Sequence, residues 1–143
     1  MRLVICGGPR TGKTTLATLL GLAGVTRHTD DLLAAHPTRD GLARACAAWL
    51  AQDGPWVVEG TAGALGLRSW LLAHPGAPCE RVVHCGTPWV ERTPAQVALA
   101  HGLERVWGEV LPLLRRRGVE VVPAGRLRAG LVARSVPGGD DRP

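Results

Sequence analysis

The sequence predicts an α/β protein, a three-layer α/β/α sandwich around a mostly parallel five-stranded sheet. Short apolar runs that end at glycine or charged residues alternate along the chain with segments of helical periodicity. The chain has 143 residues, 45% of them hydrophobic, which is enough for one domain with its own core. We expect that single domain over residues 1–135, with a lid-like segment near residues 86–102 and a disordered tail over 136–143.

The first half of the chain begins with a continuous apolar run over residues 3–6, typical of a buried parallel strand. A helix is expected from Lys13, with Leu16, Leu19 and Leu20 at helical spacing and an end at Gly21 and Gly24. The further predicted elements are a strand over residues 25–29, a helix over residues 40–51 capped by Asp40 and a strand over residues 56–59.

The second half continues the alternation with a helix over residues 65–72 and a strand over residues 81–85. Thr93, Pro94 and Gln96 provide an N-cap, a proline in the first turn and a capping-box partner, so a long helix is expected to start there. Its predicted apolar stripe consists of Val97, Leu103, Val106, Trp107, Val110, Leu111 and Leu114. The helix is expected to kink at Pro112 and to end at Gly118, a fifth strand follows over residues 119–122, and the pattern fades after Pro123.

The loop between the first strand and the first helix matches the phosphate-binding pattern G-x-x-x-x-G-K-[ST]. It reads Gly7, Gly8, Pro9, Arg10, Thr11, Gly12, Lys13 and Thr14. Backbone N–H groups of such a loop converge on phosphate oxygens at a helix N-terminus. We expect Lys13 to bridge the β- and γ-phosphates, Thr14 to bind Mg²⁺ and Thr15 to contact the α-phosphate of ATP.

The use of lysine in this chain strengthens the assignment of the phosphate-binding motif. The chain has 17 lysine and arginine residues, and Lys13 is the only lysine among them. A site that retains lysine in an arginine-rich chain is one that favours a compact ammonium over a planar guanidinium. The alternative, a glycine turn that fits the pattern by chance, is disfavoured by the flanking strand and helix.

Three carboxylates are candidates for the chemistry. Asp30 and Asp31 follow the second strand, and ligands of open α/β sheets bind outside the carboxyl ends of strands. We expect Asp30 to orient or deprotonate an acceptor hydroxyl and Asp31 to assist Mg²⁺ through water, the alternative being that Asp31 caps a helix. Glu59 ends the third strand and is the expected metal-side carboxylate if that strand lies beside the first, rather than a salt-bridged surface residue.

Phosphoryl transfer also requires cations near the γ-phosphate, often arginines from a mobile segment. Arg68 and Arg92 are the main candidates, and Arg92 is the only arginine between residues 86 and 102. The alternative for each arginine is a solvated surface position.

The composition argues against a membrane-spanning protein and against a disulfide framework. No stretch reaches the roughly 18 uncharged apolar residues of a membrane-spanning helix, and no cleavable leader is evident, so a cytoplasmic protein is expected. The four cysteines are far apart and form no C-x-x-C pair, which favours free thiols. The formal charge of +5 suits an anionic ligand without identifying one.

Taken together, several segments resemble a group of small bacterial and phage P-loop ATP-binding proteins, similar in layout to the nucleoside monophosphate, shikimate and polynucleotide kinase branch. The segments are the phosphate loop and residues 28–31, 55–60, 67–71, 96–102 and 106–119. The resemblance implies a P-loop NTPase fold, with Lys13 and Thr14 on the nucleotide and Mg²⁺, Asp30 on the acceptor side and Arg68 as a substrate or phosphate contact.

The leading hypothesis is therefore a Mg²⁺-dependent kinase, a transferase that passes the γ-phosphoryl of ATP to a small molecule with a hydroxyl or phosphate group. Two alternatives stay open. One is a polynucleotide 5′-kinase or RNA-processing enzyme, in which the basic excess guides a nucleic-acid end. The other is a nucleotide-responsive binding module or weak ATPase.

Overall fold

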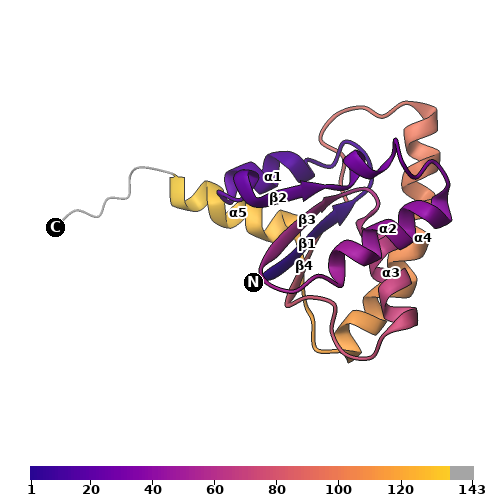
Figure 1. Cartoon of the computed structure of the whole chain (residues 1–143). Coiled ribbons are helices and arrows are strands. Elements are labelled where there is room, and N and C mark those ends of the chain that lie inside the picture. Colours follow the sequence, from indigo (N-terminus) through magenta and orange to yellow (C-terminus); the bar gives the residue numbers. More distant parts are fainter. Residues whose placement is uncertain (136–143) are drawn as a thin grey trace.

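Five parallel strands form the centre of the molecule in the computed structural model, which describes residues 1–135, with side chains as far as residue 129. The strands are β1 (Arg2–Gly7), β2 (Thr26–His28), β3 (Trp56–Gly60), β4 (Arg81–Cys85) and β5 (Glu120–Pro123) (Figure 1). Their order in the sheet is β2-β3-β1-β4-β5, and every neighbouring pair is parallel. The predicted five-stranded parallel sheet is confirmed.

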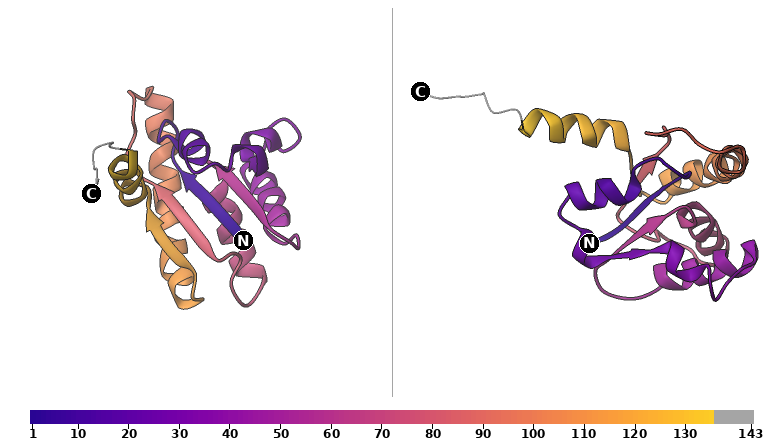
Figure 2. Two further views of the ribbon diagram at one scale, coloured as in Figure 1. Left: turned by 90° about the vertical axis from the view of Figure 1, so that its left-hand side faces the viewer. Right: turned by 90° about the horizontal axis from the view of Figure 1, so that it is seen from above.

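Helices cover both faces of this sheet (Figure 2). The helices α1 (Lys13–Leu19) and α5 (Ala124–Ser135) lie on one face, and α2 (Arg39–Leu50), α3 (Gly63–Ala73) and α4 (Pro94–Arg116) lie on the other. Successive side chains of β1 point to opposite faces, so Leu3 and Ile5 pack in the core under α1 and α5, while Val4 and Cys6 pack in the larger core under α2, α3 and α4. The predicted three-layer sandwich is thereby confirmed.

The helix starts show where local sequence signals hold. At α4, the Thr93 hydroxyl accepts from the Gln96 N–H and the Gln96 side chain accepts from the Thr93 N–H, so the predicted capping box is present. At α2, the predicted cap was wrong: Thr38 is the N-cap and accepts from the Gly41 N–H, while Asp40 lies in the first turn. An acidic residue there still interacts favourably with the helix dipole.

Other element boundaries differ from the predictions. The helix α1 ends at Leu19 and a 3₁₀ turn (η1, Ala23–Val25) follows it, because Gly21 takes a left-handed conformation with φ of 74°. The strand β2 ends at His28, so Asp30 and Asp31 lie in a second 3₁₀ turn, η2 (Thr29–Leu32). The helix α4 continues through Pro112 to Arg116, and Val97, assigned to its apolar stripe, is exposed.

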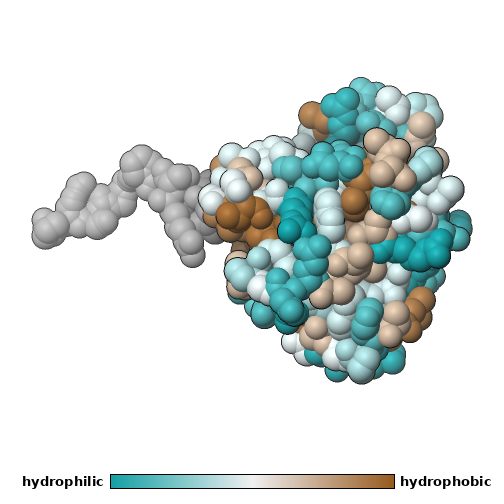
Figure 3. Space-filling model, viewed as in Figure 1, coloured by the Kyte–Doolittle hydropathy of each residue, from teal (hydrophilic) through white to brown (hydrophobic). Residues whose placement is uncertain are grey.

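The helix α5 was missed altogether, and the predicted tail over residues 136–143 lies outside the described residues. All four cysteines are buried and free, as expected. On the face shown in Figure 3, hydrophobic residues occur as small separate patches among hydrophilic ones. Within the described residues, none of the helices has the length and apolar character needed to cross a membrane.

Candidate functional site

The loop between β1 and α1 lies at the carboxyl end of the central strand. It bends sharply at its glycines: Gly7 packs so closely on β4 that a Cβ atom would collide with the Cys85 carbonyl oxygen, and Gly12 has a left-handed φ of 79°. Arg10 shares that left-handed region, with φ of 63°. The α1 helix begins directly after Gly12, so the loop leads its backbone into a helix N-terminus.

Lys13 lies buried within this loop, with only 7% of its surface exposed. Its Nζ atom donates to the Gly8 carbonyl oxygen at 2.7 Å and lies 3.4 Å from the Thr11 hydroxyl, which itself donates to Gly8 O at 2.8 Å. Burial lowers the pKa of Lys13, and the negative charge of Glu59 opposes this effect. The ammonium is therefore held by neutral oxygens only, with an acidic group close by.

Glu59 provides that acidic group and is itself 4% exposed. The strand β3 pairs directly with β1, and Glu59 lies opposite Ile5 in the register. Glu59 was expected near the phosphate loop if these two strands were neighbours, and they are. One carboxylate oxygen accepts from the Thr14 hydroxyl at 3.2 Å, and the other lies 2.5 Å from His28 Nδ1. His28, which sequence reasoning did not single out, pairs with Glu59 in the register of β2 and β3 and fixes the carboxylate's orientation.

The outer side of the loop is held by three donors from distant parts of the chain. The carbonyl oxygen of Pro9 accepts from Arg92 Nε, that of Arg10 from the Trp89 N–H, and that of Thr11 from Arg128 Nη2, each at 2.7 Å. Three consecutive loop carbonyls are thus engaged by donors from distant parts of the chain. These bonds hold the backbone of the loop in place.

Trp89 and Arg128 also pack on each other. The Arg128 guanidinium lies 4.3 Å from the centroid of the Trp89 ring, and the indole lies against Gly12. Sequence reasoning missed both residues. Trp89 could have been noticed as a large apolar residue in the lid-like segment, and it is 47% exposed. Arg128 lies after Pro123, where the sequence no longer shows a clear helix or strand pattern.

The aspartates lie on the other side of the loop. Both side chains are exposed in η2, and neither makes a hydrogen bond or ion pair with any side chain as far as residue 129. Asp30 is close enough to Lys13 for its charge to oppose the lowering of the lysine pKa. The structure therefore brings Asp30 into the neighbourhood of Lys13.

The two arginines are placed differently. Arg92 lies on the loop, where its guanidinium borders Gly8 and donates to Pro9. Arg68 lies on α3 and pairs with Glu109 of α4 at 3.2 Å, so its guanidinium is engaged away from the loop. Thr15 is exposed in the first turn of α1.

Comparison with known proteins agrees with this geometry at the level of fold. No protein-family model matches the sequence, and no curated protein sequence matches it either. Among solved structures, the chain is similar to "Shikimate kinase from Acinetobacter baumannii in complex with shikimate", with a TM-score of 0.50 and 12% sequence identity over 94% of each chain. The chain therefore has the P-loop kinase-like α/β fold of that structure, with its phosphate-loop motif at the carboxyl end of β1.

Proposed function

We propose that this protein binds Mg²⁺-ATP and transfers the γ-phosphoryl group to a hydroxyl or phosphate of a small molecule. One observation carries the proposal: the Thr14 hydroxyl meets the buried Glu59 carboxylate at 3.2 Å, beside a buried Lys13 in a glycine-rich loop. These are a hydroxyl, a carboxylate and an ammonium in the combination that phosphoryl transfer uses.

The surroundings of Lys13 support the proposed binding of a triphosphate. A buried ammonium bonded only to neutral oxygens is incompletely compensated, because ionised partners give stronger hydrogen bonds than neutral ones. A phosphate oxygen would supply the missing charge. The N–H groups of the loop and the first turn of α1, with Thr15 among them, would bind the other phosphate oxygens.

A magnesium ion fits the residues present. Mg²⁺ prefers oxygen ligands and keeps several waters, so it is usually held by one or two protein side chains together with substrate phosphates. Thr14 and Glu59 supply one hydroxyl and one carboxylate, and within the described residues no group of three or more potential ligands competes for the ion. His28 leaves one Glu59 oxygen facing Thr14. When bound, Mg²⁺ would neutralise charge on the phosphates.

Asp30 is assigned to the acceptor. Its exposed carboxylate would accept the proton of the acceptor hydroxyl as that oxygen bonds to the γ-phosphorus and the bond to the ADP oxygen breaks. Asp31 is assigned to a water-mediated contact with the ion. Arg92 would stabilise the transferred group, and Arg68 would have to leave Glu109 to reach a substrate.

The test is ADP release from Mg²⁺-ATP by wild type and Lys13→Ala, with and without pooled nucleosides, nucleotides, hydroxylated metabolites and 5′-hydroxyl oligonucleotides. We expect turnover only with a small-molecule pool, and none in the variant. Stimulation by oligonucleotides alone would identify a polynucleotide kinase instead. ATP binding that needs Lys13 but supports no stimulated turnover would contradict the kinase and favour a nucleotide-responsive binding module.

A further inference from the structure

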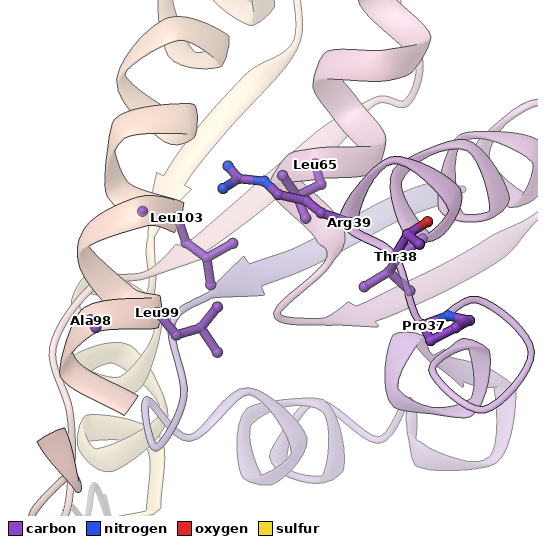
Figure 4. Close-up of a pocket in the computed structure, with 9 residues that line it drawn as sticks. Pro37, Thr38, Arg39, Leu65, Ala98, Leu99 and Leu103 are labelled. Carbon is purple, nitrogen blue, oxygen red and sulfur yellow. The ribbon is translucent and has the colours of Figure 1, made fainter. Parts of the chain in front are cut away.

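A cavity of about 280 Å³ lies between the starts of α2, α3 and α4 (Figure 4). Leu99 and Leu103 enter it from α4, Leu65 enters it from α3, and Arg39 extends across it from the first turn of α2 toward α4. Its nine lining residues are Pro37, Thr38, Arg39, Leu42, Leu65, Ala98, Leu99, Gly102 and Leu103. This size suits a small molecule.

The helix α4 borders both the cavity and the phosphate loop. Ala98, Leu99 and Gly102 line the cavity, and Ala100 of the same helix packs on the loop, where a Cβ atom on Gly8 would lie 3.1 Å from the Ala100 Cβ. On its opposite side the cavity is bounded by residues 37–42, which follow η2 and therefore Asp30. The cavity is thus bordered by the helix that packs on the assigned nucleotide loop and by the chain segment that follows the assigned base.

The walls of the cavity are mostly apolar. Four leucines contribute to the lining, and the Thr38 hydroxyl already accepts from the Gly41 N–H as the cap of α2. A sugar-like acceptor with several hydroxyls, or a nucleobase, would leave polar atoms without partners against these leucines. The lining therefore favours a ligand with an apolar body.

Arg39 gives the cavity its charge. It is the one charged residue among the nine that line the cavity, and no carboxylate is among them. Its Nη1 atom comes within 4.0 Å of the position of a Cβ atom built on Gly102, so the guanidinium spans the space between α2 and α4. A guanidinium binds carboxylates and phosphates in bidentate geometry.

We infer that the phosphoryl acceptor is a small amphipathic acid: an apolar body against the leucines, one anionic group on Arg39 and a hydroxyl directed to the phosphate loop. This inference rests on the proposed kinase function and names its substrate class. Affinity comes from the apolar walls, and Arg39 selects acids over neutral molecules of the same shape.

Gly102 allows the cavity to be filled without disturbing the fold. A Cβ atom at this helical position meets only the end of Arg39 within 4.0 Å, so we expect the side chain of Gly102→Leu to occupy the cavity, and replacing a helical glycine favours the helix. Gly108→Leu on the same helix is the matched control, because a Cβ atom there meets nothing within 4 Å. Arg39→Gln removes the charge, and Arg44→Gln on the exposed side of α2 is its control.

The probes are 4-(hydroxymethyl)benzoate, its neutral amide 4-(hydroxymethyl)benzamide, and shikimate as an acid with several hydroxyls. Binding is measured without nucleotide by saturation-transfer NMR and calorimetry, and ADP release is measured with Mg²⁺-ATP. We expect the benzoate to bind at least tenfold more tightly than either other probe. Gly102→Leu and Arg39→Gln should each weaken it at least tenfold, with both controls unchanged.

The two readouts separate the two proposals. Equal binding of the benzoate and the amide, preference for shikimate, or an unaffected Gly102→Leu variant would overturn the assigned substrate class, while ADP release with another acceptor would still support the kinase. Benzoate binding that Gly102→Leu abolishes, without ADP release from any acceptor by a protein that binds ATP, would overturn both the kinase and the acceptor role of the cavity.

Discussion

The two sides of the carboxyl edge of the sheet are built differently. On the side of the phosphate loop, Lys13, Thr11 and Glu59 are buried, and their side chains are held by hydrogen bonds. On the side of η2 and α2, Asp30 is exposed in the 3₁₀ turn, and Arg39 is exposed beside a cavity with apolar walls. The first side is fixed before any ligand binds, whereas the second presents charged groups to solvent.

This difference indicates that the two sides of the candidate site have different roles. Preorganised groups stabilise developing charge without reorganisation, which suits a triphosphate common to many reactions. Exposed groups on the side of η2 and α2 are accessible to a second ligand, which under the proposed function would suit selection between acceptors. Variants on the two sides should therefore affect different measurements.

The largest effect is expected on the exposed side, from Asp30→Asn. The amide cannot accept the acceptor's proton, so acceptor-dependent ADP release should fall by about 10²–10⁴-fold. ATP affinity and melting temperature should stay unchanged, because the Asp30 side chain is exposed. Activity equal to wild type would contradict the role assigned to Asp30.

Arg128→Ala tests the outer contacts of the phosphate loop. Loss of the bond to the Thr11 carbonyl and of the contact with Trp89 should loosen the loop and weaken ATP binding about tenfold, equivalent to about 1.4 kcal/mol. Calorimetric titration with a non-hydrolysable ATP analogue would measure this. Arg126→Ala, an exposed position on the same helix, is the control, and equal losses in both variants would show that Arg128 has no specific role.

Lys13→Met should separate stability from function. Because burial lowers the lysine pKa in the folded state, the unfolded chain binds that proton more tightly, and this group's contribution to stability rises as the pH increases toward 10.5. The variant should be more stable than wild type at pH 8 by on the order of 1 kcal/mol, and the gap should narrow at pH 10. Urea unfolding at both pH values checks this, and a less stable variant would contradict it.

Arg68→Ala should have the smallest effect. The ion pair with Glu109 is solvent-exposed, so its loss should cost about 0.2–1 kcal/mol of unfolding free energy, less at high salt. Thermal unfolding at two salt concentrations measures it. A turnover loss above tenfold with an unchanged melting temperature would instead place Arg68 on the substrate during the reaction.

Local sequence signals were sufficient where short-range interactions decide the structure. The phosphate loop between β1 and α1 and the capping box at Thr93 could both be predicted, because each depends on neighbouring residues. The place of Glu59 near the loop could be predicted only on the condition that β3 lies beside β1, as it does. The α2 cap shows the limit: Thr38 and Asp40 are both acceptable caps, and the backbone selects the residue with extended φ and ψ.

The missed features depend on contacts between distant residues. The helix α5 contains two glycines and two arginines among its first seven residues, and it packs against α1, β4 and β5. Arg128 reaches Thr11 across 117 positions of the chain. Sequence periodicity does not reveal which distant residues contact each other. The ion pair of Arg68 with Glu109 on another helix could not be predicted for the same reason.

If Thr14 and Glu59 hold a magnesium ion, magnesium should strengthen nucleotide binding through these two side chains. Calorimetry with a non-hydrolysable ATP analogue, with and without Mg²⁺, would compare wild type with Thr14→Val, Glu59→Gln and the control Thr18→Val, an exposed threonine on the same helix. We predict that Mg²⁺ increases affinity in wild type and Thr18→Val, and much less in the other two. Binding that is independent of magnesium, or equally strengthened in all four proteins, would contradict the assigned site.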